Sequence, residues 1–365
     1  GGKVVYAGPA MGQAMETDTV IDVAGMWVTP GIFAAVTDIG LADVGGVSES
    51  NDTSANSSPF NAALDVATSI NPSSQDIAVT RVGGVTRATV APSPGKSIFA
   101  GQGALIDTGA DPDAVTEARA FQLVTLGEGG ARLAGGSRVA SEVTLRNALR
   151  EARAFADGKW GGDDAMLTRA DAAALGPVVA GKQKLYIRVE RASDIRTLLA
   201  MKQEFQQLDM VLVGVSEGWL VAKELAASGV PVIADPLDDL PSSFEQLAAT
   251  QSNVGRMTQA GVKVAIGGIA AFDQPRNLKQ YAGNLVALQK VPRAAGLSWG
   301  QALASITSIP AAISGMGGKL GVLAPGAAAD VVVWDGDPLE LSSAPVHVFI
   351  DGVQQPLENH QTRLR

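Results

Sequence analysis

The second half of the chain alternates short apolar runs with stretches of helical periodicity. Four apolar runs, which we predict to be β-strands, are residues 184–189, 210–215, 230–234 and 262–266. Helices are predicted between them. Strands and helices that alternate at this spacing form repeated βαβ units around a parallel sheet. The runs are apolar throughout, as expected where both faces of the sheet are covered, and the number of units favours a closed (β/α)8-type barrel over an open sheet.

Two predicted helices have a serine at their expected start. Ser193 precedes a helix predicted over residues 194–206, and Ser216 precedes one predicted over residues 217–227. A serine hydroxyl at this position accepts a hydrogen bond from a free backbone N–H of the first turn. We therefore predict that both serines are N-caps.

Both ends of the chain have a different pattern. Residues 3–28 contain short β-type runs broken by glycine and proline, and residues 319–358 are turn-rich and β-like. We expect these similar ends, which flank the α/β body, to pair. The predicted domains are a distorted (β/α)8 TIM-type barrel at residues 29–318 and a small composite β-sandwich at residues 1–28 and 319–365.

Composition excludes several kinds of partner. With 365 residues and 46% hydrophobic content, the chain has enough apolar residues for the core of one large barrel. The net charge is −9 and no Lys/Arg-rich run occurs, which argues against nucleic acid or an anionic membrane as partner. No apolar run approaches the roughly 18 residues of a membrane span. The chain has 0 cysteines and begins in the middle of a pattern, which is compatible with an exported, periplasmic bacterial protein; the compartment otherwise stays open.

One motif indicates a different class of enzyme. Residues 214–218 fit G-x-S-x-G and follow a predicted strand, as the nucleophile elbow of a serine hydrolase does. Ser216, a later aspartate and either His347 or His360 would give the chain order of such a triad. Both histidines, however, lie in the β-like C-terminal part, away from the predicted barrel. We therefore favour the N-cap role for Ser216.

Short segments along the chain form a pattern that covers almost its whole length. They are residues 20–31 (VIDVAGMWVTPG), 83–86, 191–195, 223–231, 307–311, 321–334 and 337–338. Together they resemble the amidohydrolase superfamily, in particular its imidazolonepropionase-like branch. The first segment resembles the family's entry into barrel strand one, and the last three resemble its exit from the barrel. The resemblance implies a metal-assisted hydrolase of C–N bonds, with its site at the C-terminal ends of the strands.

The chain departs from this resemblance where the family places its metal ligands. Val36 and Asp38 stand at the strand-one positions, and Arg188 stands at the strand-five position. Gly214 stands at the strand-six position and Ile269 at the strand-eight position. Glu190 replaces a further family histidine near strand five, and Asp273 lies beyond the strand-eight position. The resemblance therefore implies a member that lacks the histidine ligands.

These replacements argue against a bound metal ion, and we expect no cofactor. Zinc-assisted hydrolysis needs nitrogen or carboxylate ligands around an ion with an open position, whereas Arg188 places a permanent cation there. We predict a degenerate pocket made by Asp38, Arg188 and Glu190. In this hypothesis Arg188 pairs with Asp38 or Glu190 and substitutes for the charge of the metal. The alternative is that these charged side chains only line a wet cavity.

A site made of carboxylates alone is a further alternative. The side chains of Asp38, Glu190, Asp235 and Asp273 could approach the barrel mouth, where oxygen ligands would suit Mg²⁺, Mn²⁺ or Ca²⁺. Taken singly, Asp235 and Asp273 are explained as turn or loop residues close to a proline.

We therefore expect a metal-free and catalytically degenerate amidohydrolase-type protein, acting as a subunit or as a ligand-binding homologue. Its expected partners are a small molecule and either further copies of itself or an active amidohydrolase homologue. The competing hypothesis is an active hydrolase of amide or cyclic amide bonds that uses Asp38 and Glu190, with or without a metal other than zinc. The sequence does not specify the substrate.

Overall fold

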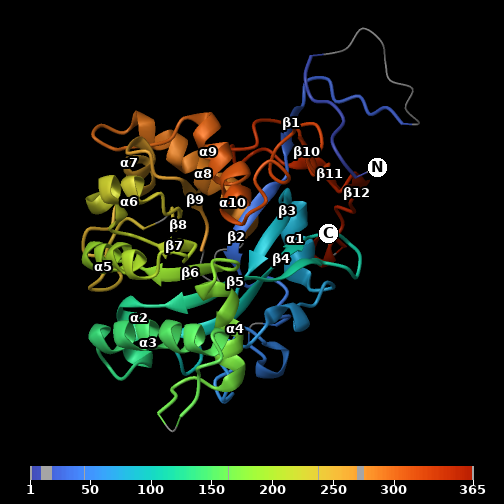
Figure 1. Cartoon of the computed structure of the whole chain (residues 1–365). Helices are drawn as coiled ribbons and strands as arrows, with labels where there is room; N and C mark the ends of the chain where they lie inside the picture. The colour runs from blue at the N-terminus through green and yellow to red at the C-terminus, as the bar shows by residue number, and fades with distance from the viewer. Residues whose placement is uncertain are drawn as a thin grey trace.

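The computed structural model describes residues 2–9, 19–44, 46–162, 164–236, 238–268 and 275–363. Ile269 and Asp273, which the sequence analysis places at or beyond the strand-eight position, lie outside these residues. An eight-stranded sheet forms the body of the molecule, and a second, small sheet lies beside one end of it (Figure 1). The expected distorted barrel with an additional β unit is confirmed.

The barrel strands follow one another in chain order around the large sheet. They are β2 (Ile32–Thr37), β3 (Val85–Val90), β4 (Phe99–Asp107), β5 (Val115–Thr125), β6 (Lys184–Val189), β7 (Met210–Gly214), β8 (Val232–Ala234) and β9 (Val264–Ile266). A parallel bridge between Ala35 and Gly267 brings the last strand back to the first. The four strands predicted in the second half of the chain are confirmed as β6 to β9.

Strand β4 departs from the predicted parallel sheet. It runs antiparallel to both β3 and β5, whereas the other neighbouring barrel strands are parallel. The connections at residues 91–98 and 108–114 contain no helix. Both are therefore hairpin connections rather than crossovers, and a hairpin makes its two strands antiparallel. This is the main distortion of the barrel.

Helices lie around the outside of the barrel in Figure 1. The α-helices of the described residues are α1 (Gln75–Val82), α2 (Gly127–Leu133), α3 (Arg138–Ala156), α4 (Arg169–Val179), α5 (Ala192–Glu204), α6 (Ala222–Ser228), α7 (Asn253–Gln259), α8 (Leu278–Ala287), α9 (Trp299–Ser305), α10 (Ser308–Ile313) and α11 (His360–Arg363). The two predicted serine caps are wrong: α5 begins before Ser193, and Ser216 is followed by a 3₁₀ turn at Gly218–Val221 rather than by an α-helix. Among the described helices, none has the length and apolar character to cross a membrane.

The two chain ends meet in the small sheet, as expected. Its antiparallel strands are β1 (Trp27–Pro30), β10 (Val331–Trp334), β11 (Pro345–Ile350) and β12 (Val353–Gln354), in that order. Within the described residues this is one sheet. Of the region 3–28, where short β-type runs were predicted, residues 4–6 and 20–23 are not strands, and Lys3 forms a bridge to Ala328. The predicted sandwich is thus a single four-stranded layer.

The interior of the barrel is a packed core. Apolar side chains from seven strands meet there, among them Ala35 and Val36 of β2 and Val213 of β7. The rings of Phe121 and Tyr186 stack with their centroids 4.2 Å apart. A filled interior of this kind leaves only the ends of the barrel for polar chemistry.

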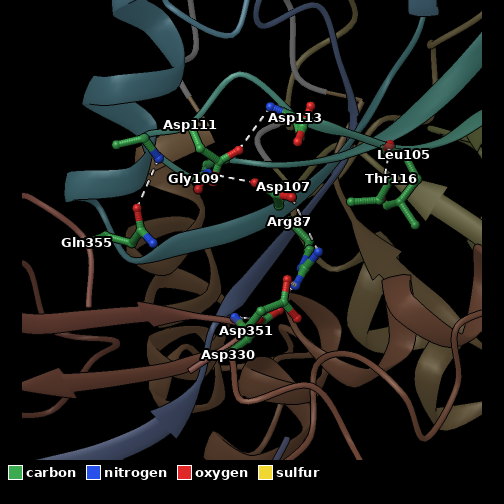
Figure 2. Close-up of polar contacts among 12 residues, drawn as sticks. Arg87, Leu105, Asp107, Gly109, Asp111, Asp113, Thr116, Asp330, Asp351 and Gln355 are labelled. Atoms are coloured by element: carbon green, nitrogen blue, oxygen red, sulfur yellow. Dashed lines mark hydrogen bonds and ion pairs between the residues drawn. The ribbon is translucent and has the colours of Figure 1, made fainter. Parts of the chain in front are cut away.

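One arginine holds the small sheet against the barrel. Arg87 of β3, which is 4% exposed, donates from Nε to Asp330 (2.7 Å) and from Nη2 to Asp330 (3.0 Å) and Asp351 (2.7 Å). Its Nη1 lies 3.7 Å from a carboxylate oxygen of Asp107, the last residue of β4. Figure 2 shows the three aspartates around the guanidinium. Because Asp330 precedes β10 and Asp351 follows β11, this ion cluster joins the two sheets.

Replacement of Arg87 should therefore destabilise the whole fold. Arg87→Gln leaves three aspartates without their cation, and loss of one partner from a buried ion cluster costs about 3–5 kcal/mol. Arg119→Gln is the matched control, because Arg119 pairs with Asp65 at 2.8 Å but its side chain is 67% exposed; about 0–1 kcal/mol is expected there. Urea unfolding at pH 7.5 measures both. Equal losses for the two variants would contradict the structural role of the cluster.

Asp107 gives the cluster a dependence on pH. Burial raises the pKa of Asp107 from 3.8 to about 6, although the Gly109 N–H and the Arg87 charge oppose the shift. Between these two pH values the folded chain binds a proton more tightly than the unfolded chain does. The stabilising contribution of this proton is therefore complete below about pH 4 and is lost as the pH rises through about 6.

We expect Asp107→Asn to remove this loss of stability at rising pH. The unfolding free energy of the variant relative to the wild type should rise between pH 4 and pH 7.5, by at most about 2–3 kcal/mol. Urea unfolding across this pH range measures the difference, and Asp113→Asn, at an exposed position of the same loop, is the control. A difference that stays constant with pH would contradict the assigned role of Asp107.

Candidate functional site

A cavity of about 350 Å³ opens at the C-terminal ends of β3, β5 and β6. Polar and charged residues on its wall are Ser93, Thr125, Arg132, Arg188, Glu190 and Glu245, and apolar ones include Pro92, Leu126 and Val189. This is the barrel mouth, where the site is predicted from the sequence. Of the three predicted site residues, Arg188 and Glu190 line the cavity, and Asp38 is not among its lining residues.

Arg188 points toward the barrel axis at the top of the packed core. Its neighbours Ile187 and Val189 pack on the helix side of the sheet, so the alternation of a strand turns Arg188 inward. Its register partner on β7, Val213, belongs to the barrel interior. Burial lowers the pKa of the Arg188 guanidinium, while the charges of Glu190 and Asp235 oppose that shift. The residue is half-buried overall because its outer surface faces the cavity.

The guanidinium of Arg188 has no direct partner in the described part of the chain. It donates no hydrogen bond there and forms no ion pair within 4.0 Å. The predicted pairing with Asp38 is not formed, and Glu190 acts on Arg188 only through its charge. Arg188 thus lines the cavity, and its five N–H groups have no acceptor among the described residues.

Asp38 lies apart because β2 is irregular just before it. Val36 has a left-handed backbone (φ 57°), and the pairing of β2 with β3 shifts register between Ala34 and Thr37. Ala35 and Val36 consequently both pack into the barrel interior, and the simple alternation that would turn residues 36 and 38 to the same side is lost. The Asp38 charge instead acts on Asp76 of α1, whose pKa is raised first by burial and then by Asp38.

Glu190 is held by the residues that follow β7. Its Oε2 accepts hydrogen bonds from the Ser216 backbone N–H (3.0 Å) and hydroxyl (2.6 Å). The same hydroxyl contacts Asp238, and Gln246 Nε2 donates to Ser216 Oγ at 3.0 Å. A serine hydroxyl has one proton, so it can donate to only one of the two carboxyl groups at a time. Burial raises the pKa of Glu190 to about 7, against the opposing effect of the Ser216 hydrogen bonds.

The carboxyl group of Glu190 occupies the place of a side chain at position 214. A Cβ atom added to Gly214 would lie 2.1 Å from Glu190 Oε1, and the backbone at Gly214 is left-handed (φ 92°). Position 214 corresponds to the strand-six histidine of the resemblance. A metal-ligating side chain at position 214 would therefore clash with Glu190 in its present position.

The residues at the family's ligand positions do not fit a divalent metal ion. The described positions offer an apolar side chain (Val36), a guanidinium (Arg188) and a glycine whose space is filled (Gly214). Across the described ranges, no group of three or more His, Cys, Asp or Glu side chains is placed to hold a metal. Asp38, Glu190 and Asp235 all belong to the described ranges, so these three side chains do not assemble the carboxylate-only site.

The nucleophile-elbow interpretation of Ser216 is wrong. Ser216 is 0% exposed and its hydroxyl is bonded to carboxyl groups rather than to a histidine. His347 lies on β11 of the small sheet, where its Nδ1 contacts Gln354. The side chain of His360 lies outside the described residues.

Several residues of the mouth were not anticipated from sequence, among them Glu245 and Thr125. Glu245 reaches in from the long segment after β8 and accepts from the Glu128 N–H (2.6 Å) and from Arg138 (3.2 Å). Thr125 ends β5 directly beside Arg188, its register partner on β6. No local pattern distinguishes either residue, because their positions depend on contacts between distant segments.

The fold is shared with solved structures of low sequence identity. An amidohydrolase from Thermotoga maritima MSB8 superposes with a TM-score of 0.85 at 23% identity, over 97% of this chain and 92% of that one. A prolidase complexed with N-methylphosphonate-L-proline gives 0.56 at 17% identity, over 97% and 93%. Atrazine chlorohydrolase TrzN from Arthrobacter aurescens TC1, complexed with zinc, gives 0.50 at 15% identity, over 100% and 92%. These similarities establish the fold.

Sequence comparison locates the likeness in the C-terminal part of the chain. The model of the amidohydrolase family matches residues 221–354. Amidohydrolase tasK of Hapsidospora irregularis is 53% identical over 60 residues, which are 16% of this chain and only 6% of that protein. The resemblance to the amidohydrolase superfamily is therefore confirmed, by the family signature within residues 221–354 and by the fold of nearly the whole chain.

Proposed function

We propose that this chain is a catalytically degenerate, metal-free protein of the amidohydrolase superfamily whose barrel mouth binds a small molecule. The observation that carries the proposal is the pair of substitutions at the ends of β6 and β7. A guanidinium stands at the strand-five ligand position, and the Glu190 carboxyl group fills the strand-six position above Gly214. Both positions contribute histidine ligands in the family pattern.

Electrostatics supports a metal-free mouth. A divalent ion about 5 Å from a guanidinium is opposed by roughly 7 kcal/mol at an effective dielectric constant of 20. Val36 provides no lone pair to offset this repulsion, and Asp38 lies toward Asp76 rather than in the cavity. A zinc ion in this mouth would therefore meet one repelling charge and few ligands.

An active hydrolase that uses Glu190 is the second candidate. A pKa near 7 suits a general acid or base at neutral pH, and Glu190 lines the cavity. The observation against it is that Asp38, the expected second carboxylate, does not line the same cavity. Degeneracy is the better-supported proposal, and assembly with copies of itself or with a histidine-complete homologue is part of it.

Metal analysis tests the proposal directly. We expect the purified chain, dialysed first against chelator and then against buffer with excess Zn²⁺ and finally against metal-free buffer, to hold far less than stoichiometric zinc. A histidine-complete amidohydrolase taken through the same steps is the control. Stoichiometric zinc in this chain, lost on Glu190→Gln, would overturn the metal-free proposal.

A hydrolysis screen separates the two candidates. We expect no turnover of amide, lactam or dipeptide substrates, with or without added Zn²⁺, Mn²⁺ or Mg²⁺. Turnover that disappears in Glu190→Ala, with the folded state preserved, would favour the active hydrolase. Absence of turnover together with co-purification of an active homologue would favour the subunit role.

A further inference from the structure

The barrel mouth contains two adjacent polar groups with no described partner. Thr125 and Arg188 are register partners on β5 and β6, and register partners in a parallel pair face the same side of the sheet. Thr125 is 7% exposed, and its Oγ1 has no hydrogen-bond partner among the described residues. Arg188 likewise donates no hydrogen bond there. A buried hydroxyl left without a partner is costly, and the half-buried Arg188 beside it lines the same cavity. A ligand that enters the cavity could satisfy both groups.

The chemistry of these groups specifies the missing partner. The planar fork of an arginine matches a carboxylate bidentately, and a neighbouring hydroxyl donates a further hydrogen bond to the same group. The rest of the cavity limits the charge of the ligand. Glu190 and Glu245 also line it, so a second negative charge on the ligand would be repelled.

The remaining wall of the cavity is apolar. Pro92 and Leu126 contribute to it, and they suit a hydrocarbon group beside the carboxylate. At about 350 Å³ the cavity has the size of a small-molecule site rather than of a peptide groove.

We propose that the barrel mouth binds a small organic monocarboxylate, whose carboxylate is held by the Arg188 guanidinium and the Thr125 hydroxyl and whose apolar body lies against Pro92 and Leu126. This inference rests on the proposed function and names its ligand class. In this proposal the Arg188 guanidinium, which stands where the family pattern has a metal ligand, binds an anion.

The first test compares ligands on the wild-type chain. The probes are 4-methylpentanoate, its neutral counterpart 4-methylpentanamide, the dianion glutarate and inorganic phosphate, titrated in the presence of chelator by calorimetry and ligand-observed NMR. We expect 4-methylpentanoate to bind with a Kd of about 1 mM or tighter and the other three at least about tenfold more weakly. Equal binding of acid and amide, or no binding of the acid, would overturn the inference.

The second test uses variants of the two anchors. Arg188→Gln should weaken the binding of 4-methylpentanoate about 10–100-fold, because a charge-assisted pair is lost. Arg188→Lys should lie between this variant and the wild type, since lysine keeps the charge without the fork. Arg119→Gln, the same change at an exposed ion pair outside the cavity, should bind as the wild type does. Equal effects at positions 188 and 119 would contradict the assignment.

Thr125→Val distinguishes a binding role from a structural one. The substitution keeps the shape and removes a hydroxyl that has no described partner, so the melting temperature should stay constant or rise. Binding of 4-methylpentanoate should nevertheless weaken about threefold to tenfold. This variant also keeps the inference testable if Arg188→Gln fails to fold. Unchanged binding in Thr125→Val would overturn the assignment of the hydroxyl.

The metal content of each titrated sample separates this inference from the function on which it rests. Stoichiometric metal would refute the metal-free proposal itself. A metal-free sample that does not bind 4-methylpentanoate would refute only the proposed ligand class.

Discussion

A positive charge fixed at the C-terminal end of β6 determines what the barrel mouth can hold. The barrel interior below Arg188 is filled with apolar side chains, so the guanidinium is directed at the cavity above them. Burial lowers its pKa, and the charges of Glu190 and Asp235 oppose that effect. A charge in such a place favours an anion and disfavours a cation. The proposed loss of metal chemistry and the proposed gain of a carboxylate ligand both follow from this single constraint.

The surroundings of Arg188 oppose a metal ligand at the neighbouring strand end. Glu190 occupies the space in which a side chain at Gly214 would stand, and Ser216 fixes it there with two hydrogen bonds. A histidine placed at position 214 alone would therefore collide with Glu190 before it could approach a metal.

At the opposite end of the barrel, a buried positive charge has a structural role. There the Arg87 guanidinium is fully engaged by aspartates and joins the barrel to the small sheet (Figure 2).

Much of the fold could be predicted from sequence, because the strands of the second half are uninterrupted apolar runs. Residues 184–189 form β6 as expected, and this strand brings Arg188 and Glu190 to the mouth. Asp38 could not be placed in this way, because the left-handed residue at position 36 and the register shift of β2 break the alternation on which the prediction depended.

Other features depend on contacts between distant segments. The antiparallel direction of β4 results from connections without helices, which the apolar pattern of the second half could not reveal. Ser216 was expected to cap a helix, but its hydroxyl is bonded to Glu190 and Asp238. The position of Thr125 beside Arg188 follows from the register of β5 and β6, which no local sequence signal gives.

The most direct measurement is an anomalous difference map at the zinc absorption edge, from crystals grown with excess Zn²⁺. If Arg188 and Glu190 exclude a metal, the map will have no peak between the C-terminal ends of β2, β6 and β7, and the electron density will show the guanidinium in contact with water or an anion. A strong peak coordinated at the ends of these strands, with Arg188 turned away, would contradict the central claim.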